Sequence, residues 1–172
     1  DHMGPAVFDS QSQLAVRPHP HINLATVTYL FDGEIIHRDS LGSHQAIRPG
    51  DINLMVAGKG IVHSERETTE RMKQDRTMDG LQLWLALPEA FEETEPGFFH
   101  YPSSEIPSVS KDGVPVRVMI GEAYGVTSPV KTYSETLYLE SRLSAGQSLQ
   151  LPGSEERALY VVKGSVTIKD EI

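Results

Sequence analysis

Short β-rich segments separated by turn residues recur along the chain, and this pattern narrows the possible folds more than any other feature. The predicted strands are Thr26–Phe31, Glu34–Asp39, Ile52–Val56, Ile61–Glu65, Leu81–Leu87, Val114–Ile120 and Thr136–Leu143. The Asp32-Gly33 pair between the first two is typical of a tight hairpin. No long segment has helical periodicity, and only Pro88–Glu93 is predicted to form a helical turn. Many short strands with Gly and Pro turns predict an all-β sandwich or barrel.

Composition excludes several classes of site and partner. The chain has no cysteine, so a metal site must use histidine and carboxylate ligands. The formal net charge is -9, which disfavours phosphate backbones and anionic membrane surfaces. No apolar run approaches the roughly 20 residues that a membrane span needs. We therefore expect a cytoplasmic protein that binds neither nucleic acid nor membrane directly.

Two dyads carry the chemistry that the sequence predicts. His19-Pro20-His21 places two imidazoles two residues apart, and His63-Ser64-Glu65 repeats the spacing with an imidazole and a carboxylate. In a strand, residues i and i+2 point to the same face, so two strands can direct four ligands to one ion. Either dyad alone would be weak evidence. Together they predict a mononuclear metal site made by His19, His21, His63 and Glu65.

The ligand types and the apolar pattern narrow the nature of this site. Three imidazoles and a carboxylate suit Fe(II), Mn(II), Ni(II), Cu(II) or Zn(II), and a cysteine-free site with open positions suits catalysis better than a structural role. Ile61 shares the parity of His63 and Glu65, which places the site inside the fold. If the first strand runs unbroken past His21, three apolar residues share its inward face: Val27, Tyr29 and Phe31. The remaining histidines are expected to be ordinary surface or pocket residues: His37, His44 and His100.

A weak internal repeat predicts two related barrels. The segment 29–36 resembles 160–167, and on this alignment His19 and His21 correspond to Gln150 and Pro152. The second copy therefore lacks the histidine pair. We expect an N-terminal metal-binding barrel over residues 1–125 and the start of a second, metal-free barrel over residues 126–172. The second barrel is expected to be incomplete within this chain, and the native protein to be longer.

Several consecutive-residue motifs resemble the pirin family of bicupins. The matching segments are His19–His21, His37–Gly42, Ile47–Asp51, Ala57–Glu65 and Leu81–Trp84. The resemblance implies an all-β, cupin-type β-barrel (a double-stranded β-helix or jelly roll), complete for the first barrel and partial for the second. It also implies one metal ion, usually iron, bound by His19, His21, His63 and Glu65. The residues after His21 depart from many pirins, and Ala25 is expected to remove a side chain from the wall of the metal pocket.

The resemblance leaves two functions open. Bacterial pirins resemble quercetin 2,3-dioxygenases, which implies an oxidoreductase that acts on a small flavonol-like aromatic substrate and O2. In that hypothesis Glu65 is catalytic and receives the substrate hydroxyl proton while it loosens from the metal; the sequence does not indicate the substrate-binding residues. The alternative is an iron-dependent regulatory protein that binds a protein partner without turnover, as eukaryotic pirins do in transcription. A third hypothesis is a barrel that holds a metal but has no catalytic function. The dioxygenase is the favoured hypothesis.

Overall fold

The computed structural model describes residues 1–169 and is almost entirely β, as the sequence predicts. Its first part contains the strands β1 (His2–Phe8), β2 (Ala15–His21), β3 (Leu24–Asp32), β4 (Ile35–Asp39), β5 (His44–Ile47), β6 (Ile52–Val56), β7 (Ile61–Arg66), β8 (Arg76–Ala86) and β9 (Gly97–Tyr101). They are followed by β10 (Ser108–Lys111), β11 (Val114–Ile120), β12 (Glu122–Ala123), β13 (Val126–Thr127) and β14 (Tyr138–Ser141). Short 3-10 helices occur at Arg71–Lys73, Glu89–Phe91 and Ser103–Glu105.

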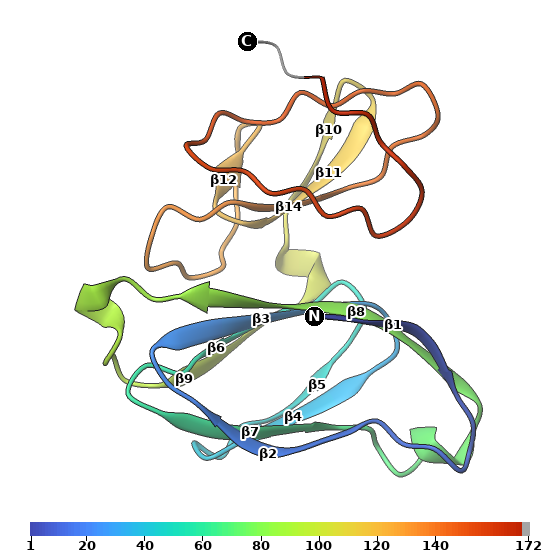
Figure 1. Ribbon diagram of the computed structural model, residues 1–172, viewed down its shortest axis with the longest axis vertical. Coiled ribbons are helices and arrows are strands. Elements are labelled where there is room, and N and C mark those ends of the chain that lie inside the picture. The colour runs from blue at the N-terminus through green and yellow to red at the C-terminus, as the bar shows by residue number, and fades with distance from the viewer. Residues whose placement is uncertain (170–172) are drawn as a thin grey trace.

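Two sheets face each other in the first part of the chain (Figure 1). The five-stranded sheet has the order β1-β8-β3-β6-β9, and the four-stranded sheet has the order β2-β7-β4-β5. The space between them is filled partly by a cluster formed by Leu30, Ile35, Ile47 and Met78. A second small cluster brings together Met55, Ala57 and Ile61. The site predicted from the sequence lies on the four-stranded sheet, because β2 and β7 are neighbours in it.

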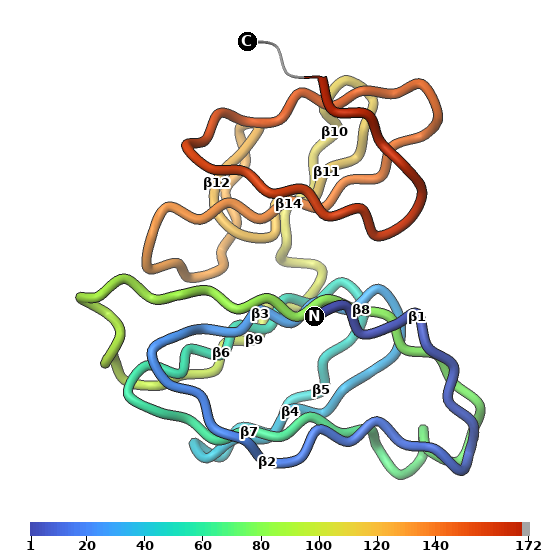
Figure 2. The backbone as a smooth tube through the Cα atoms, in the orientation of Figure 1, coloured from blue at the N-terminus to red at the C-terminus, as the bar shows by residue number. Residues whose placement is uncertain are grey.

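The remaining strands form a separate layer above the five-stranded sheet. β11 pairs with β10 on one side and with β14 on the other, and residues 142–169 run around them without regular strands (Figure 2). A large core joins this layer to the outer face of the five-stranded sheet. It includes Ala25, Val27, Tyr29, Ile52, Leu54, Val56, Met119, Ile120 and Val130. Both faces of the five-stranded sheet are therefore covered, which explains why the middle of β3, residues 25–30, is buried without interruption.

The inward direction of Val27, Tyr29 and Phe31 required an unbroken strand past His21, and the structure does not have one. β2 ends at His21, and Asn23 takes a left-handed backbone conformation with φ 61° before β3 begins. This break moves the chain from one sheet to the other and reverses which side chains face the interior. Val27 and Tyr29 consequently pack toward the layer of β10, β11 and β14. Thr28 takes the inward direction, where its hydroxyl accepts a hydrogen bond from Gln82.

The division of the chain near residue 125 stays a prediction, with one relevant observation. β10 and β11 precede that point, and β14, which pairs with β11, follows it. The strands on both sides of residue 125 thus share a sheet. We propose that the second barrel begins between β9 and β10, because β9 pairs with β6 of the first part. Among residues 1–169, none of the helices has the length and apolar character of a membrane span.

Replacing Gly58 by alanine is expected to lower the free energy of unfolding by about 2–4 kcal/mol. Gly58 has φ +50°, and a Cβ there would lie 2.0 Å from the carbonyl oxygen of Thr94. Gly42 is the matched control, since its φ is +91° but a Cβ would meet nothing within 4 Å. Gly42→Ala should therefore cost only about 1–2 kcal/mol. Urea unfolding of both variants measures the difference, and equal losses would contradict the steric argument.

Candidate metal centre

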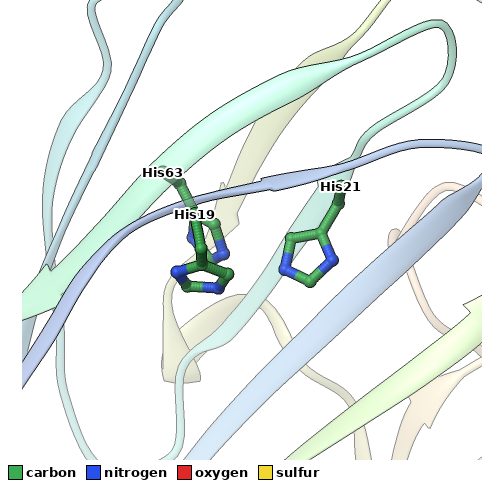
Figure 3. Close-up of side chains that lie close together, drawn as sticks. All are labelled: His19, His21 and His63. Atoms are coloured by element: carbon green, nitrogen blue, oxygen red, sulfur yellow. The ribbon is translucent and has the colours of Figure 1, made fainter.

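The antiparallel pairing of β2 with β7 brings the two sequence dyads together. His19 lies directly opposite His63, and His21 lies opposite Ile61. A bulge between Val16 and His19 adjusts the register, so that both histidines of β2 face the same way as His63. Figure 3 shows the three rings on one side of the paired strands. Their ligand nitrogens all lie within 4.8 Å of one another, so these three residues could hold a metal ion.

The free nitrogen atoms of this cluster fit a metal ion. The Nδ1 of His19 donates to the carbonyl oxygen of Arg17 at 2.8 Å, which leaves its Nε2 as the lone-pair nitrogen. The Nε2 atoms of His21 and His63 are buried and have no hydrogen-bond partner among residues 1–169. An unsatisfied buried polar atom costs about 1–3 kcal/mol, so such atoms usually indicate a missing partner. A divalent cation with nitrogen preference would satisfy them, and the residues present fit that group.

The electrostatics keep the rings of His21 and His63 in the neutral form that binds metals. Burial lowers the pKa of His63 to about 3, helped by the neighbouring imidazoles of His19, His37 and His21. Burial also lowers the pKa of His21, and His19 adds to the effect. Near neutral pH the imidazoles of His21 and His63 are therefore neutral, and each has one nitrogen with a lone pair for a metal.

Glu65, the fourth predicted ligand, lies on the same face of β7 as His63, but its carboxylate is not among the clustered ligand atoms. The set of ligand atoms within 4.8 Å of one another comprises the three histidines and does not include its carboxylate. Glu65 is 3% exposed, and its Oε1 accepts a hydrogen bond from Nε2 of Gln82 at 2.8 Å. Burial raises the pKa of Glu65, while the bond from Gln82 and the nearby His19 oppose the rise. A buried carboxyl beside the histidines is suited to holding or accepting a proton.

His37 is the histidine that sequence reasoning placed wrongly. It is buried, its Nδ1 lies 3.4 Å from Nδ1 of His63, and its Nε2 lies 2.9 Å from Oδ2 of Asp39. The signal was present, because His37-Arg38-Asp39 is a third dyad with the i, i+2 spacing. The other two histidines are as expected: His44 is exposed, and His100 bonds to Asn53 in a half-buried position.

Comparisons with known proteins agree with the motifs. Residues 1–85 match the family model described as Pirin. The chain is 46% identical to a pirin-like protein of Caulobacter vibrioides, over 98% of this chain and 59% of the relative, and 39% identical to human pirin, over 87% and 51%. A crystal structure of quercetin 2,3-dioxygenase from Acinetobacter baumannii superimposes with a TM-score of 0.75 and 41% identity. That match covers 81% of this chain and 45% of the other.

The chain belongs to the pirin family. It has the all-β fold of its cupin-type neighbours, and it spans about half the length of the relatives and the structure it matches. Ala25 was expected to remove a side chain from the wall of the metal pocket, but it does not lie at that pocket. Ala25 is buried on the outer face of the five-stranded sheet, within the core that joins it to the second layer. The prediction was wrong because the left-handed turn at Asn23 reverses the direction of the following side chains.

An exposed aromatic ring lies beside the pirin histidine cluster. The ring of Trp84, on β8, lies 5.3 Å from that of His21 at an interplanar angle of 83°. Trp84 is nevertheless 65% exposed, which is unusual for the largest apolar side chain. The sequence identified Trp84 as part of a motif but not as a site residue, because its exposure depends on how the two sheets meet. A flat apolar surface next to three ligand nitrogens is suited to a planar aromatic compound.

Proposed function

We propose that this pirin is a metal-dependent dioxygenase of flavonols such as quercetin, with Fe(II) as the metal and His19, His21, His63 and Glu65 as its ligands. The observation that carries the proposal is the convergence of three imidazoles, two of which have buried Nε2 atoms without a partner among residues 1–169, next to the exposed ring of Trp84. The similarity to proteins named quercetin 2,3-dioxygenase supports the choice of substrate. When bound, the metal would supply Lewis acidity toward the flavonol and a site for dioxygen.

The chain's own residues supply positioning and proton transfer in this proposal. The ring of Trp84 stacks on the planar flavonol and directs its hydroxyl and carbonyl oxygens toward the histidine cluster. The carboxylate of Glu65 accepts the hydroxyl proton, and the hydrogen bond from Gln82 holds that carboxylate in place. The raised pKa of Glu65 makes its carboxylate a better proton acceptor than an exposed one.

Metal analysis followed by oxygen uptake tests the proposal. Purified protein would be stripped of metal, reloaded with Fe(II), Mn(II), Ni(II), Cu(II) or Zn(II), and mixed with quercetin in an oxygen electrode. We expect about one metal per chain and consumption of dioxygen matched to the loss of quercetin. One bound metal with no uptake under any loading would reject the dioxygenase and favour the regulatory alternative.

Replacing Trp84 by alanine is expected to raise the KM for quercetin by roughly 2- to 13-fold, since an aromatic pair contributes about 0.5–1.5 kcal/mol. The kcat should change little, because Trp84 makes the same contact before and during the reaction. Phe91→Ala is the matched control: Phe91 is also exposed but contacts Tyr133. An unchanged KM for Trp84→Ala would remove Trp84 from the substrate site.

A further inference from the structure

A buried chain of hydrogen bonds leads from the histidine cluster to a carboxylate in the neighbouring strand. β4 pairs with β7 so that Asp39 lies opposite His63 and His37 lies opposite Glu65. Nδ1 of His63 contacts Nδ1 of His37 at 3.4 Å, and Nε2 of His37 contacts Oδ2 of Asp39 at 2.9 Å. The side chains of His37 and Asp39 are 3% and 0% exposed. Water therefore has little access to this chain, and its members must satisfy one another.

The carboxylate of Asp39 determines where the protons of this chain lie. Its Oδ1 accepts hydrogen bonds from the backbone N–H groups of Leu41 at 2.9 Å and Ser43 at 3.0 Å. Its Oδ2 faces His37, and because a carboxylate only accepts, the proton of His37 must lie on Nε2. The Nδ1 of His37 is then an acceptor, so the proton of His63 must lie on its own Nδ1. This leaves the Nε2 of His63 unprotonated.

Two further observations agree with this assignment. The Nε2 of His63 is the atom that is buried without a partner among residues 1–169, as a ligand nitrogen would be before metal binding. The ring of His37 stacks on Phe98, with centroids 4.0 Å apart and an interplanar angle of 14°, so its plane is fixed by packing. The imidazole of His63 thus meets a rigid acceptor rather than mobile solvent.

We propose that His37 and Asp39 are positioning residues, which hold His63 in the tautomer and orientation that present its Nε2 to the metal. The proposal rests on the proposed metal site but adds residues outside the predicted ligand set. Hydrogen-bond partners behind a ligating histidine typically change metal affinity by about 10- to 100-fold. His19 has a simpler equivalent, since its Nδ1 donates to the carbonyl oxygen of Arg17.

Asp39→Asn tests the proposal because it should exchange the protonated and unprotonated nitrogens of His37 and His63. It also keeps a side chain of the same size at position 39. The two backbone N–H groups of Leu41 and Ser43 hold the amide oxygen in the place of Oδ1, so the amide NH2 faces His37. His37 would then accept at Nε2 and carry its proton on Nδ1, directly against the N–H of His63. We expect the dissociation constant for Fe(II) or Zn(II) to rise by about 10- to 100-fold. Asp79→Asn is the matched control, because Asp79 also bonds to a histidine, His2, at 2.8 Å.

A spectroscopic readout separates this proposal from the proposed function. Nitrogen-15 NMR of the metal-free wild type should show His63 protonated at Nδ1, and Asp39→Asn should shift that proton to Nε2. Wild-type His63 protonated at Nε2 would overturn the positioning role even if Asp39→Asn did not fold. The positioning role would also be overturned if the metal dissociation constants of Asp39→Asn and Asp79→Asn agreed within twofold. A wild type that binds no metal would reject the proposed function, while the tautomer of His63 would still test the role of Asp39.

Discussion

Replacing Glu65 by glutamine is expected to lower the kcat for quercetin by about 10²–10⁴-fold, the usual contribution of a positioned general base. The glutamine oxygen can still accept the hydrogen bond that Gln82 donates at 2.8 Å, so the local structure should persist. An amide, however, cannot take up the hydroxyl proton of the flavonol. Because the three imidazoles remain, metal content should stay close to that of the wild type. Oxygen uptake with quercetin and metal analysis of the same sample measure both quantities.

The control for this prediction is Glu95→Gln, which changes an exposed glutamate that pairs with Lys59 on the surface. Its kcat and metal content should both match the wild type. Unchanged turnover in Glu65→Gln would exclude Glu65 as the base. A parallel loss of metal and turnover would show that Glu65 is needed mainly as a metal ligand rather than as the base.

Bound metal is expected to raise the melting temperature of the wild type, and His63→Ala should abolish the rise. A ligand at a hundredfold excess over its dissociation constant stabilises the native state by about 2.7 kcal/mol. For a chain of this length, that corresponds to roughly 5–11 °C. His63 supplies one of the three rings of the cluster, and its ring centroid lies 4.4 Å from that of His19 and 5.1 Å from that of His21. Scanning calorimetry with and without a chelator measures the shift.

His44→Ala is the control for the thermal prediction, because His44 is an exposed histidine of β5 outside the cluster. It should retain the full metal-dependent shift. A His63→Ala protein that keeps the wild-type shift would place the metal elsewhere. The metal-free melting temperature of His63→Ala would show separately how much the lost packing of a buried ring destabilises the fold.

The sequence was most informative where function depends on local geometry. Side chains two residues apart in a strand point to the same face, so His19 with His21 could be recognised as convergent from their spacing alone. Side-chain directions predicted from residue spacing failed where the chain leaves a strand. The left-handed turn at Asn23 reversed the expected directions of Val27 and Ala25, and no periodicity signals such a reversal. The strand β9 was not among the predicted strands, since it gains its strand character by pairing with β6.

By itself, the sequence determined the all-β class, the absence of thiolate ligands and the shared face of His19 and His21, because these follow from composition and from the two-residue period of a strand. Tertiary structure alone decided which groups lie behind and beside the three histidines. His37 reaches His63 because β4 pairs with β7, and Trp84 reaches His21 because β8 belongs to the facing sheet. Such contacts depend on strand order, which is set by the packing of whole sheets and leaves no pattern between neighbouring residues.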